Sequence, residues 1–219
     1  MQIADCNRDT KPGEIITLGT YPQNADGYDI TPIEWRVLQN SGSELFILSE
    51  FILDCKRYHG KSADITWYDC VDITWRDCDL RKWLNDEFYN TAFTATEKGL
   101  IKTAPCTDNG EGCPDTEDRV FLLSVNEVKD ISDKHGRDLL RSVGTDFAKT
   151  KKSDGCSLYV YDKTNKDNYI IKNGRKSAVP GGGFEHRETS PPVRFFSVQA
   201  AVFAATPMSV QPETVCAPL

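Results

Sequence analysis

Two nearly identical heptapeptides, DITWYDC (Asp64–Cys70) and DITWRDC (Asp72–Cys78), each place a tryptophan between carboxylates. Indole faces stack on sugar rings, and carboxylates bind hydroxyl groups or Ca²⁺, so one interpretation is a ligand platform. The candidate residues of this platform are Trp67, Trp75, Asp72 and Asp77. The alternative is that Trp75 belongs to the core and the first copy is a duplication in a surface loop. We favour the alternative, because a period of eight residues is too short for a solenoid repeat.

The cysteines offer little support for a metal site. All eight are irregularly spaced, and no CxxC pair occurs, which disfavours structural zinc. Cys70, Cys78 and His59 could be grouped as a metal cluster, but reduced thiols in a cytoplasmic chain are the simpler interpretation. We therefore predict no metal and no cofactor.

The sequence names no catalytic residue. The three histidines are far apart in the chain, and no Cys–His or Ser–His nucleophile pair can be identified. Asp26, Asp29 and Glu34 could act as acid and base, but nothing fixes the separation that glycoside chemistry requires. We interpret these three carboxylates as surface charges.

Charge and hydropathy exclude several partners. A net charge of -7 and a pI near 5.1 disfavour nucleic acid and anionic membrane surfaces, both of which need clustered basic residues. No apolar stretch approaches the ~20 residues of a membrane span. The N-terminal stretch MQIADCNRDTKPGE has no apolar segment of the kind a signal peptide contains. The expected localisation is cytoplasmic as the chain stands, or that of a fragment of an exported protein.

Strands are predicted before the repeat. The β-branched run at 15–17 favours an extended backbone, which Gly19 and Pro22 then interrupt. In PIEWRVL, side chains alternate around Trp35, and the turn NSGSE leads into the continuous apolar run LFILSE. This pattern predicts a hairpin with Trp35 on its core side.

Short helices are predicted after the repeat. Apolar residues with helical spacing indicate a helix from about residue 79 to Asn90, with Asp77 or Asp79 as its N-cap. Thr94 and Glu97 have capping-box spacing for a second helix over 95–101. A polar loop (104–118), a strand (120–123), a helix from about 124, a helical turn within 145–152 and two further strands follow. The mixture predicts an α+β domain with small antiparallel sheets.

Six motifs in this order resemble an uncharacterised bacterial domain family. They are ITLGTYPQ, PIEWRVL, FILSEFILD, TWRDCDLRKWLNDEFYNTAFTATEKGLI, DRVFLLSVNEV and GTDFAK, and they cover about residues 13–152. The resemblance implies a C-type-lectin-like fold of the kind found in formylglycine-generating-enzyme domains. Within it Arg81, Trp83 and Asn85 match an RxWLN pattern, which we interpret as structural, like Trp35.

The last forty residues differ from the rest. The segment from Pro180 to Leu219 has no Lys, Asp or Tyr, and it lacks the WWLRSPG and GVRPAL segments that the resemblance implies. Read from the last base of the Pro180 codon, degenerate codons for PGGGFEHRE can spell Trp-Trp-Trp-Leu-Arg-(Ala/Thr)-Pro-Gly. We therefore expect an N-terminal lead (1–12), one domain (13–179) and a disordered or out-of-frame tail (180–219). The alternative is a genuine Pro/Ala/Val-rich tail.

These observations favour a noncatalytic binding or display module for a glycan or a protein, impaired by the loss of its C-terminal motifs. Two alternatives stay open. One is a remnant of a formylglycine-generating-type enzyme, and the other is a structural segment of a larger bacterial surface protein.

Overall fold

Short helices pack against small antiparallel sheets, as the sequence predicts for an α+β domain. The computed structural model describes residues 1–59, 73–109, 112–140, 142–150, 195–198 and 200–206. The expected strands after residue 152 and the first copy of the repeat lie outside these residues. No helix in the described ranges is both long and apolar enough to cross a membrane.

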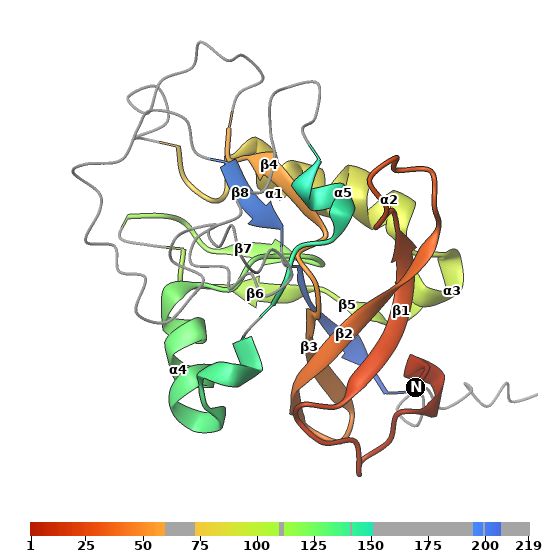
Figure 1. Ribbon diagram of the computed structural model, residues 1–219. Coiled ribbons are helices and arrows are strands. Elements are labelled where there is room, and N and C mark those ends of the chain that lie inside the picture. The colour runs from red at the N-terminus through yellow and green to blue at the C-terminus, as the bar shows by residue number, and fades with distance from the viewer. Residues whose placement is uncertain (60–72, 110–111, 141, 151–194, 199, 207–219) are drawn as a thin grey trace, which may run out of the picture.

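The largest sheet is curled and contains five antiparallel strands in the order β1-β2-β3-β9-β5 (Figure 1). These strands are β1 (Ile15–Tyr21), β2 (Thr31–Asn40), β3 (Glu44–Ser49), β9 (Ala201–Ala205) and β5 (Ile101–Lys102). The pairing of β2 with β3 confirms the predicted hairpin. Trp35 of β2 is fully buried, and its indole N–H donates to the Leu18 carbonyl at 2.7 Å. The buried faces of this sheet supply much of the core.

Two strand pairs flank this sheet. One pairs β4 (Asp54–Arg57) with β8 (Phe195–Val198), and the other pairs β6 (Ala104–Cys106) with β7 (Thr116–Asp118). The predicted polar loop at 104–118 is therefore a hairpin whose ends form strands. Residues of β4 and β7 contact opposite sides of the same helix, as described below.

The described helices are η1 (Ile3–Asp5), α1 (Asp79–Trp83), the π-helical η3 (Leu84–Phe88), α2 (Tyr89–Ala92), α3 (Ala95–Leu100), α4 (Val125–His135), η4 (Arg137–Leu140) and α5 (Asp146–Lys149). Side chains cap α1, α3, α4 and α5, whereas η3 and α2 continue the helix that α1 begins. The predicted Thr94–Glu97 capping box is present at α3. The prediction of Asp77 or Asp79 as the cap of α1 is wrong, because the Cys78 sulfur accepts the Arg81 N–H instead.

Two described segments outside residues 13–179 pack with the rest of the fold. Residues 201–205, assigned above to an atypical tail, form β9 in the interior of the main sheet, where Phe203 stacks on Phe46 with ring centroids 4.4 Å apart. Ile3 and Cys6, in the expected N-terminal lead, are buried in the core. Both segments therefore belong to the folded body.

Residues 120–123 are described by the structure, and they do not form the predicted strand. Phe121 makes a single bridge with Ala201, and the flanking residues do not extend the pairing. The apolar run is instead explained by packing, because Val120, Phe121 and Leu123 are all buried.

Candidate functional site

The helix formed by α1, η3 and α2 carries most of the residues that the sequence singled out. On one side it contacts Asp118 at the end of β7, a buried carboxylate with three donors. Arg81 Nε donates to Oδ1 at 2.7 Å, while Trp75 Nε1 and Thr116 Oγ1 donate to Oδ2 at 3.0 and 2.8 Å. Because every donor faces the carboxylate at hydrogen-bond distance, Asp118 is a structural junction.

One helical turn after Arg81, Asn85 attaches the same helix to the backbone of residues 119–120. Its Nδ2 donates to the carbonyls of Arg81 and Val120 at 3.1 and 2.9 Å. Its Oδ1 accepts the backbone N–H groups of Arg119 and Val120 at 2.7 and 3.2 Å. Arg81 and Asn85 together hold the helix to residues 116–120.

Trp75 does not present a ring to a ligand. Its side chain is 7 % exposed, and its N–H is committed to Asp118. Asp77 is on the surface, where its carboxylate accepts from Thr74 Oγ1 at 2.9 Å and lies 3.4 Å from Arg76 Nε. The hydrogen bond from Thr74 is the main cause that lowers the pKa of Asp77. Trp67 and Asp72 lie outside the described residues.

Trp83 lies between Arg81 and Asn85 in sequence but faces β4. Its half-buried ring packs on Phe88 with centroids 5.5 Å apart, and the Lys56 ammonium lies 4.5 Å from the ring centroid. The structure therefore brings together Trp75, Arg81 and Asn85 around β7, and it places Trp83 on a different surface. Trp35 belongs to the main sheet.

Three of the described thiols are poor nucleophiles. Burial raises the pKa of Cys78 to about 11 and that of Cys106 to about 12, and it also raises the pKa of Cys6. Because the thiolate is the reactive form, these cysteines are unreactive near neutral pH. In the described ranges, no group of three or more His, Cys, Asp or Glu side chains is placed to hold a metal ion.

A small pocket opens beside Trp75. Its lining residues are Trp75, Cys106, Asp108, Asn109, Leu122, Ser124 and Glu127, and its volume of about 20 Å³ has room for one water molecule. A sugar ring is far larger than this, so the pocket does not provide the platform considered above.

The loop between β1 and β2 was not identified from the sequence as a site. It projects beside α5 (Figure 1) and displays Tyr28 with 90 % and Ile30 with 80 % of their surface exposed. Asp29 orders the loop, because its carboxylate accepts the N–H groups of Gln23 (2.9 Å) and Asn24 (2.9 Å). The Thr31 hydroxyl also donates to Asp29 at 2.6 Å and is the main cause that lowers the pKa of this carboxyl.

Phe147 of α5 packs against this loop. Its N–H donates to the Gln23 carbonyl at 3.0 Å. Gly27 has φ +72°, and a Cβ there would lie 2.7 Å from the Phe147 ring, so only glycine fits. The signal in the sequence was an aromatic and an aliphatic residue inside the turn segment NADGYDI. Asp29 is therefore more than a surface charge, because its carboxylate accepts the hydrogen bonds that order this loop.

Comparison with known proteins places most of the chain in a family. A family model described as "Domain of unknown function (DUF6273)" matches residues 42–179. No curated protein matches the chain, and no solved structure does. The match ends immediately before Pro180, where the composition changes. Because it covers more than half of the 219 residues, the chain belongs to the DUF6273 family, a family of domains of unknown function.

Proposed function

We propose that this domain is a noncatalytic binding module that contacts a protein partner through residues 23–30, which we call the display loop. The observation that carries the proposal is the exposure of Tyr28 and Ile30 on a backbone held by Asp29. Large exposed apolar side chains on an ordered loop are typical of interaction sites. A C-type-lectin-like fold, which the family resemblance implies, is part of the same proposal.

Binding through this loop gains free energy from the burial of apolar side chains and loses little conformational entropy. Transferring an aromatic or aliphatic side chain from water into a partner pocket contributes about 1.5–3 kcal/mol. A flexible loop would lose part of this gain as conformational entropy, whereas a pre-organised loop loses less. Tyrosine also has few rotatable bonds for its contact area, which explains its frequency at binding hot spots.

The side chains favour a protein over a glycan. A sugar ring could stack on Tyr28, but Ile30 offers it neither a π face nor a hydrogen bond. A protein pocket can bury both side chains. Asp26 is exposed on the same loop, and the chain carries a net charge of -7, so the complementary pocket is apolar with a basic rim.

The enzyme alternative has less support. A formylglycine-generating-type reaction would need a reactive thiol, and among the described cysteines burial raises the pKa values of Cys6, Cys78 and Cys106.

The test uses a random peptide library selected on the immobilised full-length chain. The selected peptides are expected to combine aliphatic with basic residues and to bind a Tyr28→Ser/Ile30→Ser variant at least about tenfold more weakly, since a lost hot spot costs more than 1.4 kcal/mol. Asp29→Asn keeps both apolar side chains but weakens the loop, so it should reduce affinity by a smaller factor. The matched control is a Met1→Ser variant made with an added initiator methionine, because Met1 is also an exposed apolar residue. Equal affinity for the double variant and the native chain would refute the proposal.

A further inference from the structure

The indole of Trp83 carries a buried hydrogen-bond donor that the fold does not use. Trp83 Nε1 is shielded from solvent and has no hydrogen-bond partner within the described part of the chain. The other two described tryptophans differ, since Trp35 and Trp75 donate at 2.7 and 3.0 Å. Buried donors are almost always paired in folded proteins, so an unpaired one calls for a functional explanation.

A positive charge lies next to this donor. The Lys56 ammonium is 4.5 Å from the Trp83 ring centroid and 3.5 Å from Asp54 Oδ2, and its side chain is 30 % exposed. Asp54 already accepts the Tyr21 hydroxyl at 2.8 Å and the Cys55 N–H at 2.7 Å. The carboxylate is therefore shared among several donors, and Lys56 can reorient towards an incoming anion.

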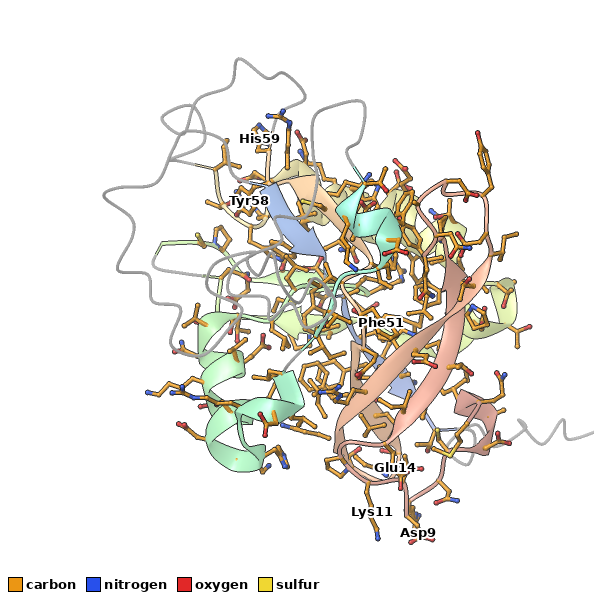
Figure 2. The ribbon with its side chains drawn as sticks, in the orientation of Figure 1. Asp9, Lys11, Glu14, Phe51, Tyr58 and His59 are labelled. Atoms are coloured by element: carbon orange, nitrogen blue, oxygen red, sulfur yellow. The ribbon has the colours of Figure 1, made fainter. Side chains whose placement is uncertain are left out.

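Further nitrogen-bearing side chains lie near Lys56, beside the carboxylates of Asp54 and Asp79. Arg57 follows Lys56 on β4, and Figure 2 shows Tyr58 and His59 at the outer end of this strand. His59 Nδ1 lies 3.4 Å from Asp79 Oδ2, yet it makes no hydrogen bond there. The β4 end of the molecule thus gathers nitrogen donors in a chain whose net charge is negative.

The backbone next to Trp83 is also unusual. The π-helical segment η3 begins at Leu84, directly after Trp83, and ends at Phe88, whose ring contacts the indole. Single π-helical turns occur frequently at functional sites, because they displace side chains from the regular α-helical positions. This is an independent reason to assign a role to the indole.

We propose that the edge between β4 and α1 binds a ligand carboxylate. When the side chains that cover the indole nitrogen move aside, one carboxylate oxygen accepts the Trp83 N–H and the other contacts the Lys56 ammonium. A carboxylate fits because it offers two acceptors and a negative charge, whereas phosphate is usually bound by more donors than these two. Acidic sugars and peptide carboxylates share this chemistry. The residues are distinct from the display loop, so the inference stands independently of the proposed function.

The test is an NMR titration of the full-length chain with sodium glucuronate and, separately, with N-acetylglycine. Indole N–H resonances report directly on the donor, and Trp83→Phe assigns the resonance of Trp83. We expect this resonance to move downfield with saturation, and we expect glucose or sodium chloride to leave it in place. Saturation by glucuronate alone identifies an acidic sugar, and saturation by N-acetylglycine identifies a peptide carboxylate; either result supports the site.

Variants separate recognition from folding. Affinity for the saturating carboxylate should fall at least about tenfold in Lys56→Gln, a loss equivalent to one charge-assisted contact. Lys102→Gln removes an exposed charge elsewhere and should bind like the native chain. Trp83→Phe retains an aromatic ring, and its thermal midpoint should match the native value. The proposal is overturned if neither carboxylate gives a saturable shift, or if Lys56→Gln binds as tightly as the native chain.

Discussion

The two sides of the helix over residues 79–92 use their polar groups in opposite ways. On the β7 side, Arg81 and Asn85 are fully engaged with Asp118 and with the backbone at 119–120. On the β4 side, Trp83 buries an N–H that has no partner in the described part of the chain. The first arrangement is what stability requires, since a buried polar group left unpaired is destabilising. The unpaired N–H of Trp83 does not stabilise the fold, and this is why we propose a role for it in recognition.

The largest expected effect is on the β7 side. Asp118→Ala would leave Arg81 Nε and Trp75 Nε1 without their acceptor, so we expect the free energy of unfolding to fall by about 3 kcal/mol. Urea denaturation followed by tryptophan fluorescence measures this loss. A double-mutant cycle with Arg81→Met should give a coupling energy above about 1 kcal/mol. Independent, additive losses would mean that the Asp118 junction does not act as one unit.

A smaller loss is expected at Asn85. Asn85→Ala removes two donors and an acceptor, and we expect a destabilisation of about 1–2 kcal/mol. Asn85→Asp keeps an acceptor for the Arg119 and Val120 N–H groups but loses both donors, so its urea midpoint should lie between those of the native chain and the alanine variant. An aspartate variant as stable as the native chain would show that the contact with the Val120 carbonyl contributes nothing.

Local patterns predicted the elements whose signals lie within a few residues. The capping box of Thr94 and Glu97 and the alternation around Trp35 both correspond to observed elements. Features that depend on burial or on distant partners were missed. Cys78 caps α1 in place of a neighbouring aspartate, and the apolar run at 120–123 packs instead of pairing. The order of the display loop depends on Phe147, more than a hundred residues away in sequence.

The C-terminal segment shows the same limit. Composition set residues 180–219 apart, and the family match ends at residue 179. Composition could not reveal that Ala201–Ala205 would fit between β3 and β5, because that fit depends on the small size of buried alanines such as Ala201 and Ala204 beside two sequence-distant strands. An out-of-frame origin of the segment stays a prediction, which the gene sequence across codons 175–219 would test.

The indole N–H spectrum of the ligand-free chain tests the contrast between the two sides of the helix most directly. The account predicts that the Trp35 and Trp75 indole protons exchange slowly with solvent and resonate downfield, because both are hydrogen-bonded. The Trp83 proton should be shielded from exchange by burial but should resonate upfield of them, because it has no acceptor. A ligand-free Trp83 resonance at the hydrogen-bonded position would contradict the account, since the donor would then already be used by the fold.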